Sequence, residues 1–306
     1  MKSVRVSAPG KLLLLGDHAV VYGYPCLVTA VNERMTLTLE PSLDGALHMD
    51  TPGVTDTRFL ETALRNGLAH WHETMPAITI RTSSGFSGQY GFGSSAAVTV
   101  ALLFALRELF QKQESLKDIF ALAFKTVIDV QGVGSGFDVA AAAWGGTLWY
   151  EKRGERIEPV HHEDMPLIVG YTGTKADTSS IVKEIAEKYA AQKDRVERIF
   201  QAMGQLVLDA RVKIEEGDWE RVGTLMDFNQ EYLRDLGVSS EKLETMISAA
   251  KRAGAWGAKL SGAGRGDSMI ALAPKEKREA VEQAIEAVGG KVIHITPAAK
   301  GVETTP

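Results

Sequence analysis

The chain has 306 residues, of which 44% are hydrophobic and 24% charged, and its formal net charge at pH 7 is −5. This composition is that of a globular protein long enough for two domains, and the acidic balance gives no reason to expect a nucleic-acid partner. The single cysteine, Cys26, excludes an internal disulfide and a metal site built from several thiolates.

The N-terminal residues contain no secretory or membrane segment. The apolar run Leu12–Leu15 is too short for the core of a signal peptide, and no apolar run reaches the length of a membrane span. One cysteine also suits a reducing compartment. We therefore expect a soluble protein of the cytoplasm with no membrane partner.

The first half of the chain predicts a β-rich layer covered by helices. Short apolar runs at 4–7, 12–15, 26–31 and 35–39 alternate with glycine, proline and asparagine turns, which is the pattern of strands. From Ser94 the apolar spacing becomes helical, and a second helical stretch covers about 116–130. A short buried helix at 139–143 and a strand at 147–150 follow.

The second half predicts a separate α+β domain. The charged stretch 153–166 has no apolar period, so we place there the boundary between an N-terminal domain, residues 1–160, and a C-terminal domain, residues 161–306. Beyond it we expect a strand at 167–171, helices at about 179–216, 219–236 and 240–253, strands at 258–260 and 268–272, a helix at 275–288 and a strand at 291–295. The tail, 297–306, is expected to be loose.

The most informative segment is the glycine-rich turn Tyr90–Ala97, which runs directly into a helix. Glycine lets the backbone approach a ligand closely, and the free N–H groups of a helix start carry partial positive charge, so the segment predicts a phosphate-binding loop. Ser94 and Ser95 add hydroxyls where the metal ion of a nucleotide would sit. The alternative is an ordinary helix start with a serine cap.

Three further glycine segments, at 9–11, 132–138 and 262–267, favour the phosphate-binding interpretation. Each offers N–H groups to anionic oxygens, although each alone is typical of a tight turn. The chain contains no GxxxxGK[ST] sequence, so an ATP site here requires another architecture.

Lys11 and Asp138 lie at the ends of two of these segments. Lys11 follows what we expect to be a tight Pro-Gly turn, and Asp138 precedes an alanine-rich helix. Beside a phosphate-binding loop, a carboxylate can accept a hydroxyl proton while a lysine stabilises the charge of the transferred phosphoryl group. The simpler interpretation is a solvated lysine and a carboxylate that interacts with the helix dipole.

In this order, the segments Pro9–Lys11 with Gly16–Gly23, Gly91–Ala97 and Lys259–Asp267 resemble the three motifs of the GHMP small-molecule kinases. The resemblance spans nearly the whole chain. It implies an α+β fold of two domains, an N-terminal ribosomal-protein-S5-like domain that binds ATP and a C-terminal ferredoxin-like domain, with ATP and Mg²⁺ as cofactors. It also implies site residues: Lys11 and Asp138 as the catalytic pair; Gly91, Gly93, Ser94, Ser95, Ala96, Gly262 and Gly264 at the nucleotide; Ser95 as a magnesium ligand; and Asp17, His18, Ser135 and Gly136 at the acceptor.

Within the family, the segment HAVVYG at 18–23 is similar to the members that phosphorylate the 5-hydroxyl of mevalonate in isoprenoid biosynthesis, and we favour that acceptor. The segment 134–142 and the Gly-Asp end of the third motif look more like the members that act on phosphomevalonate, so the acceptor stays open. Two positions depart from the family pattern. Val127 stands where a magnesium-binding glutamate is usual, with Asp129 the nearest acid, and Arg265 replaces a usual glycine and is expected to contact a phosphate.

Two other functions remain as alternatives. One is a non-catalytic nucleotide-binding protein on the same fold, against which the intact Lys11 and Asp138 argue. The other is a decarboxylase of diphosphomevalonate, against which the HAVVYG segment argues. We further expect a small molecule as the substrate and a homodimer as the assembly.

Overall fold

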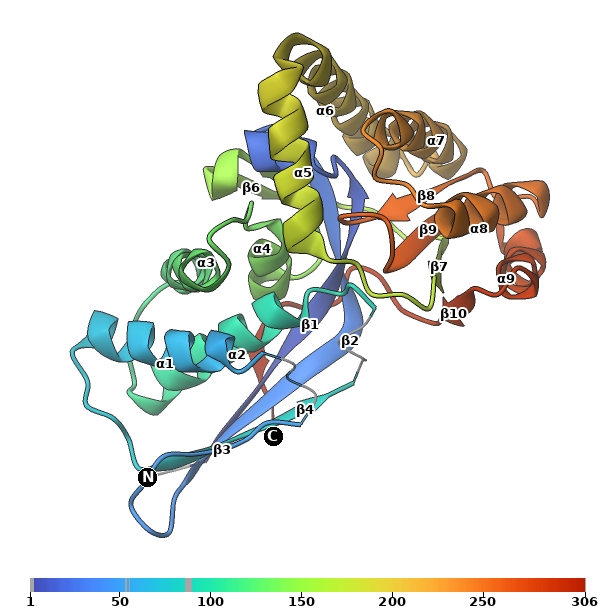
Figure 1. Cartoon of the computed structure of the whole chain (residues 1–306). Helices are drawn as coiled ribbons and strands as arrows, with labels where there is room; N and C mark the ends of the chain where they lie inside the picture. The colour runs from blue at the N-terminus through green and yellow to red at the C-terminus, as the bar shows by residue number, and fades with distance from the viewer. Residues whose placement is uncertain (1–2, 53, 55, 86–89, 306) are drawn as a thin grey trace.

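The computed structural model describes residues 3–52, 54, 56–85 and 90–305, and these form two lobes, each a sheet covered by helices (Figure 1). The first lobe contains a sheet of seven strands in which β11, β1, β2, β4 and β3 are neighbours in that order, while β5 pairs with β2 and β6 with β5. These strands are β1 (Val4–Leu15), β2 (Cys26–Pro41), β3 (His48–Asp50), β4 (Ile78–Ser84), β5 (Thr147–Glu151), β6 (Arg156–Pro159) and β11 (Glu303–Thr304).

Four helices cover this sheet: α1 (Arg58–Trp71), α2 (Ser94–Leu109), α3 (Leu116–Gln131) and α4 (Phe137–Trp144). One apolar cluster joins them to the strands, with Leu37 of β2, Leu60 of α1 and Leu102 of α2 among its fully buried members. A capping box between Ser115 and Asp118 fixes the start of α3, because each side chain accepts a hydrogen bond from the backbone of the other. Helix α2 is packed in this core, and the two residues at its start, Ser94 and Ser95, are only partly buried.

The second lobe has four antiparallel strands: β7 (Leu167–Tyr171), β8 (Gly257–Ser261), β9 (Ser268–Leu272) and β10 (Lys291–Ile293), in the spatial order β10-β7-β9-β8. Its helices are α5 (Thr178–Ala191), α6 (Lys193–Glu216), α7 (Trp219–Asp235), α8 (Glu241–Arg252) and α9 (Arg278–Ala287). In chain order the strands occupy the fourth, first, third and second places, which is the ferredoxin-like arrangement expected from the sequence. Short 3₁₀ turns lie at Ala19–Tyr22 (η1), Lys152–Gly154 (η2) and Lys275–Lys277 (η3).

The expected strands at the start of the chain are longer than their apolar runs. Runs 4–7 and 12–15 belong to one strand, β1, and the segment Pro9-Gly10 inside it is a shift of register against β2 rather than a tight turn. Runs 26–31 and 35–39 likewise form the single strand β2. The strand continues through polar residues because its backbone groups pair on both sides, which the apolar pattern does not record.

The expected helix at 179–216 is two helices, α5 and α6, that meet at Gln192. The backbone of Gln192 lies outside the helical region, with φ −135° and ψ 48°. Side chains from both helices, Ile185 of α5 and Phe200 of α6 for example, pack into the same apolar cluster. Buried apolar residues therefore occur on both sides of Gln192, which is why the sequence pattern predicts one helix instead of two.

The expectation of a loose tail is wrong. β11 pairs with β1 in the first lobe, and isolated bridges join Pro297 to Val31 and Lys300 to Gly145. The chain thus leaves the second sheet at β10 and ends on the first sheet. The tail has no apolar period that would predict a strand. Its contacts are hydrogen bonds between backbone groups, which nearly every residue type can form.

Across the described residues no helix is both long and apolar enough to cross a membrane. Before the tail, the last strand of the first sheet is β6, which ends at Pro159, and the second sheet begins with β7 at Leu167, so the change of lobe falls near the expected boundary at residue 160. The division into domains 1–160 and 161–306 stays a prediction, since the tail returns to the first lobe.

Candidate active site

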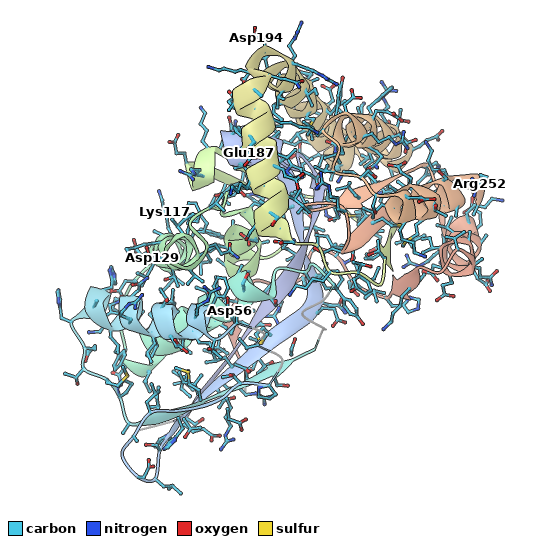
Figure 2. The ribbon with its side chains drawn as sticks, in the orientation of Figure 1. Asp56, Lys117, Asp129, Glu187, Asp194 and Arg252 are labelled. Atoms are coloured by element: carbon cyan, nitrogen blue, oxygen red, sulfur yellow. The ribbon has the colours of Figure 1, made fainter. Side chains whose placement is uncertain are left out.

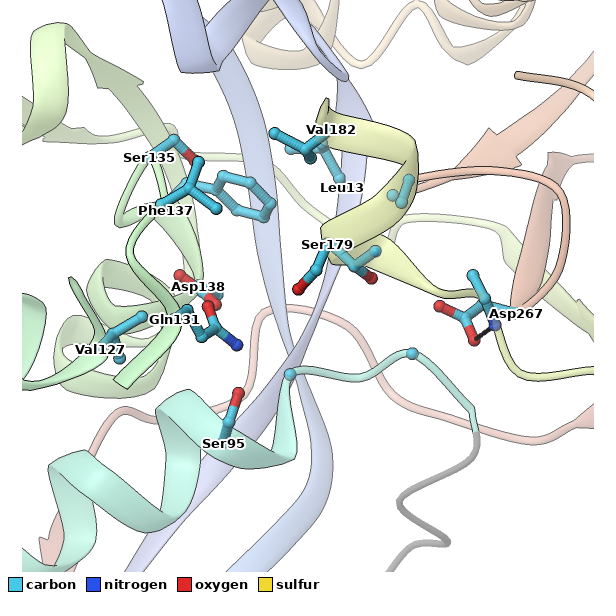
Figure 3. Close-up of a pocket in the computed structure, with 18 of the residues that line it drawn as sticks. Leu13, Ser95, Val127, Gln131, Ser135, Phe137, Asp138, Ser179, Val182 and Asp267 are labelled. Carbon is cyan, nitrogen blue, oxygen red and sulfur yellow. Dashed lines mark hydrogen bonds between the residues drawn. The ribbon is translucent and has the colours of Figure 1, made fainter. Parts of the chain in front are cut away.

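A cavity of about 360 Å³ lies between the two lobes (Figure 3). Its walls come from β1, the start of α2, α3, the segment before α4, the start of α5 and the loop that follows β8. Nine of the residues singled out in the sequence line it: Lys11, His18, Gly91, Gly93, Ser94, Ser95, Ser135, Asp138 and Gly262. Segments from four distant parts of the chain therefore meet at one place.

Lys11 and Asp138 face each other across a single glycine. A Cβ placed on Gly93 would lie 3.2 Å from Cε of Lys11 and 3.6 Å from Cβ of Asp138. Lys11 projects from β1, and its Nζ donates a hydrogen bond to the carbonyl oxygen of Gly91 at 2.8 Å. Asp138 is the second residue of α4, and its Oδ1 accepts from the backbone N–H of Val139 at 3.0 Å. Both charged groups border the same cavity.

The two charged groups perturb each other and are both desolvated. Removal from water raises the pKa of Asp138 above its ordinary value of 3.8, and the nearby Lys11 ammonium partly opposes this. Removal from water also lowers the pKa of Lys11 below 10.5, opposed by the charges of Asp138, Asp267 and Asp17. Most other charged side chains lie at the surface, as Lys117, Glu187 and Arg252 do in Figure 2, so these buried charges are exceptional.

The glycine loop is held against both lobes. Gly91 and Gly93 have φ of +73° and +75°, a conformation that other residues rarely adopt. The backbone N–H of Lys11 donates to the carbonyl of Phe92 at 2.9 Å, and from the second lobe Ser268 Oγ donates to the carbonyl of Tyr90 at 2.9 Å. The N-cap of the helix that begins at Ser94 is Gly93, which has no side chain to cap it, so the expected serine-capped start is not what the structure contains.

Several residues of the cavity wall have no role predicted from the sequence. Asp267 is buried, and its Oδ1 accepts from the backbone N–H of Ala176 at 2.9 Å. Lys175, just before α5, and Ser179, in its first turn, also line the cavity. The sequence pattern includes Asp267 only as the last residue of the third motif. Asp177 is the N-cap of α5, and an aspartate at this position is a sequence signal for the start of that helix.

Four of the singled-out residues do not line the cavity: Asp17, Ala96, Gly136 and Gly264. Ala96 is buried inside the first turn of α2. A Cβ on Gly136 would lie 2.6 Å from the hydroxyl of Tyr150, and one on Gly264 would lie 2.2 Å from the carbonyl of Val238. These glycines permit close packing around the site. Asp17 is fully buried and forms an ion pair with Lys259.

The comparison with known proteins agrees with this geometry. Residues 58–146 match the N-terminal domain of GHMP kinases, and residues 210–291 match the GHMP kinases C terminal region. A mevalonate kinase of Thermococcus sibiricus is 35% identical over 95% of both chains, and one of Pyrococcus horikoshii is 36% identical over 95% of this chain and 94% of its own. The chain belongs to the GHMP kinase family.

Solved structures of GHMP kinases have the same two-lobed fold. The L. major mevalonate kinase in complex with R-mevalonate is 27% identical, with a TM-score of 0.82 over 96% of this chain and 95% of that one. The phosphomevalonate kinase of Streptococcus pneumoniae has a TM-score of 0.83 over 97% of this chain and 100% of that one, but at 18% identity the similarity concerns the fold alone. The expected α+β fold of GHMP kinases is confirmed.

The position of the usual magnesium-binding glutamate is a departure from the GHMP kinase pattern, as the sequence predicted. Val127 lines the cavity from α3 with an apolar side chain, and Asp129 does not line it but hydrogen-bonds to Lys125 and Asn66. One turn further on, Gln131 reaches into the cavity on the same side as Asp138, with Ser95 opposite (Figure 3). Among the described residues no group of three or more His, Cys, Asp or Glu side chains is placed to hold a metal ion.

Arg265 does not take the position expected from the sequence. Its guanidinium pairs with Glu184 of α5 at 2.7 Å and donates to the carbonyl of Gly237, and the residue does not line the cavity. The expectation that Arg265 contacts a bound phosphate is therefore wrong for this conformation. A carboxylate on the neighbouring helix satisfies the arginine instead, and no local sequence pattern would have revealed that pair.

Proposed function

We propose that this chain is an ATP-dependent kinase that phosphorylates the 5-hydroxyl of mevalonate, a step of isoprenoid biosynthesis. The observation that carries the proposal is the placement of Lys11 and Asp138 around one glycine, at the mouth of the Gly91–Ser95 loop. The names of the relatives, mevalonate kinases at 35% and 36% identity over 95% of this chain, support the acceptor.

Each residue of the pair has a role in the transfer. Asp138 orients the hydroxyl and takes its proton while the hydroxyl oxygen forms a bond to the γ-phosphorus. The bond from that phosphorus to the bridging oxygen breaks, and ADP leaves with the electron pair. Lys11 lies beside the transferred group and offsets its negative charge, and its hydrogen bond to Gly91 holds the ammonium in place. The raised pKa of Asp138 makes it a stronger base than a solvated aspartate.

The polyphosphate is proposed to lie along Gly91–Ser95, where the first N–H groups of α2 have no capping side chain. Gly262 and Gly264 belong to the loop between β8 and β9 in the second lobe. Gly262 lines the cavity. Ala96 contributes through its backbone, because its side chain is buried in the first turn of α2.

The donors present fit a magnesium ion. The hydroxyl of Ser95 and the carboxylate of Asp138 line the same cavity, and Mg²⁺ is usually held by one or two carboxylates together with phosphate oxygens and water. The ion would neutralise charge on the phosphates. Since Val127 offers no ligand and Asp138 serves as the base, Ser95 is the side chain of this chain that would hold the ion together with phosphate oxygens and water, with Gln131 as a neutral neighbour.

The charges of the cavity favour mevalonate over phosphomevalonate. Along the described cavity wall the lysines are Lys11 and Lys175, and no arginine is present. The phosphate that phosphomevalonate carries would need more cationic donors, typically an arginine fork. His18 adds a polar group to the same cavity wall as Ser135: its Nε2 donates to the carbonyl of Ala263 at 2.9 Å, which leaves Nδ1 as the acceptor of the neutral ring.

An assay that couples ADP release to a recorded signal tests this function, with mevalonate, phosphomevalonate, homoserine and galactose as acceptors. We expect turnover with mevalonate. Turnover with phosphomevalonate alone would establish the second candidate, and carbon dioxide release from diphosphomevalonate would establish a decarboxylase. ATP binding by calorimetry without any product would indicate a non-catalytic binding protein. The homodimer and the cytoplasmic location stay predictions from the sequence, and light scattering after size-exclusion chromatography checks the first.

A further inference from the structure

We propose that Asp17 is a positioning residue and not an acceptor ligand: with Lys259 it fixes the loop Gly262–Ala263 of the second lobe beside Lys11 and Asp138. The role in catalysis rests on the proposed kinase function, while the role in holding the loop does not.

Asp17 joins elements of both lobes. It follows β1 in the first lobe and has no solvent exposure. Its Oδ2 lies 2.7 Å from Nζ of Lys259 on β8, and its Oδ1 accepts from the backbone N–H of Gly262 at 2.8 Å. Asn229 of α7, also fully buried, donates from Nδ2 to Oδ2 at 3.4 Å. Both carboxylate oxygens are therefore occupied by groups of the second lobe.

The contacts of Asp17 continue into the cavity wall. His18, the next residue, hydrogen-bonds through Nε2 to Ala263, the residue after Gly262. Ser261 at the end of β8 is the residue before Gly262, and its Oγ accepts from the N–H of Leu13 on β1 and donates to the carbonyl of Leu13, each at 3.0 Å. The loop after β8 is thus attached to β1 and to the segment that follows it at three successive points.

The electrostatics exclude a change of partner during binding. Lys259 is as fully buried as Asp17, and its own removal from water lowers its pKa, an effect that the adjacent carboxylate opposes. A carboxylate that turned toward an acceptor would leave this ammonium buried and unpaired, which is strongly unfavourable. Asp17 does not line the cavity. Its chain neighbour His18 and its hydrogen-bond partner Gly262 do.

Two paired substitutions separate positioning from simple stability. Asp17→Asn with Lys259→Met removes both charges and keeps an oxygen that accepts from Gly262 N–H. Asp17→Leu with Lys259→Met also removes both charges but leaves no acceptor for that N–H. We expect the Leu pair to melt a few degrees below the Asn pair, because one N–H group is left without an acceptor. We expect kcat/KM for the acceptor to stay within about threefold of wild type in the Asn pair and to fall by about 100-fold in the Leu pair, because misplacement of site groups by about 1 Å has effects of that size.

Hydrogen exchange gives a readout that does not depend on catalysis. The peptide 259–267 should exchange faster in the Leu pair than in the Asn pair, while a peptide from β9 should be unchanged. Gln230→Met serves as the matched control: Gln230 is buried, accepts from the N–H of Leu260 on β8 at 3.0 Å, and among the described residues forms its hydrogen bonds within the second lobe. It should lower the melting temperature and leave kcat/KM within about threefold.

Each outcome decides a different claim. Equal activity in both pairs together with equal exchange of 259–267 would overturn the positioning role. A selective rise of KM for the acceptor in the Asn pair, with exchange unchanged, would make Asp17 an acceptor ligand after all. If wild type turns over no mevalonate, the proposed function fails, and the exchange comparison alone still decides whether Asp17 holds the loop.

Discussion

Asp138 is the residue at which activity and stability should separate most clearly. Its pKa is raised in the folded state, so the stability contributed by its proton is present below about pH 3.8 and is lost as the pH rises through the folded pKa. At neutral pH the buried charge therefore lowers stability. Asp138→Asn should reduce kcat by about 10²- to 10⁴-fold, the usual contribution of a general base, with an unchanged or slightly higher melting temperature. Steady-state kinetics and calorimetric melting at pH 7 measure both, and an active variant would remove Asp138 from the mechanism.

Lys11 should set the alkaline limit of the reaction. Its pKa is held below 10.5 by removal from water, so activity should decline with rising pH before a solvated lysine would lose its proton, while the acid limb lies above 3.8 because of Asp138. In Lys11→Arg the guanidinium keeps its charge at these pH values, so the alkaline limb should move to higher pH even where kcat is lower. Profiles of kcat/KM from pH 5 to 10.5 with a stable buffer series test this. An unchanged alkaline limb in the variant would assign it to another group.

The sequence predicted the proposed catalytic pair but not all that surrounds it. Lys11 and Asp138 could be singled out because each ends a glycine segment, and the structure places both at one cavity. The true partners of Asp17 and Arg265 could not, because Lys259 and Glu184 lie far from them in the chain and meet them only through the packing of the two lobes. Charge complementarity across an interface leaves no periodic signal in one sequence.

The turn before α2 requires glycine for two separate reasons, and a matched pair of variants distinguishes them. Gly93 and Gly217 have φ of +75° and +73°, but a Cβ on Gly93 would lie 3.2 Å from Lys11 whereas one on Gly217, at the end of α6, would meet nothing within 4 Å. Alanine at either position should destabilise the fold by about 1–2 kcal/mol. Gly93→Ala should in addition displace Lys11 and lower kcat/KM by about 10²-fold. Melting curves and kinetics of both variants suffice, and equal activity would mean that Lys11 tolerates the methyl group.

At the scale of elements, strands and helices of the second lobe followed their apolar patterns closely. β7 has the bounds expected from the sequence, 167–171, and so does β9, 268–272. The errors occurred where backbone geometry changes without a change in apolar spacing, as at Gln192 between α5 and α6 and at the register shift after Pro9. A side-chain pattern reports which face is buried, not whether the hydrogen-bond ladder is interrupted.

The whole molecule is closed by a tail that the sequence did not identify as structured. After β10 the chain returns to the first lobe, where Gly146 N–H donates to Ala299 at 2.7 Å and Val302 N–H donates to Ala143 at 3.2 Å. Both lobes are therefore tied together by the end of the chain as well as by the contacts of Asp17. Such ties should limit how far the lobes separate when a nucleotide enters the cavity.

Arg34 of β2 provides the test of this attachment. Its guanidinium donates to the carbonyls of Lys300 at 2.6 Å and Gly301 at 2.8 Å and to Ser7 on β1, and it lies 3.4 Å from Glu303. A lysine cannot form this fork, so Arg34→Lys should remove about 3 kcal/mol of stability and lower the melting temperature by about 5 to 10 °C. Protease cleavage within residues 297–305 should become faster, whereas kcat at 25 °C should change less than threefold because Arg34 does not line the cavity.

Arg278→Lys is the control, because a lysine can keep the single surface pair with Glu282 on α9, and its melting temperature should shift by no more than about 2 °C. If the two variants melt alike, the tail is held by its backbone pairing with β1, and the arginine fork contributes little to the closure of the molecule.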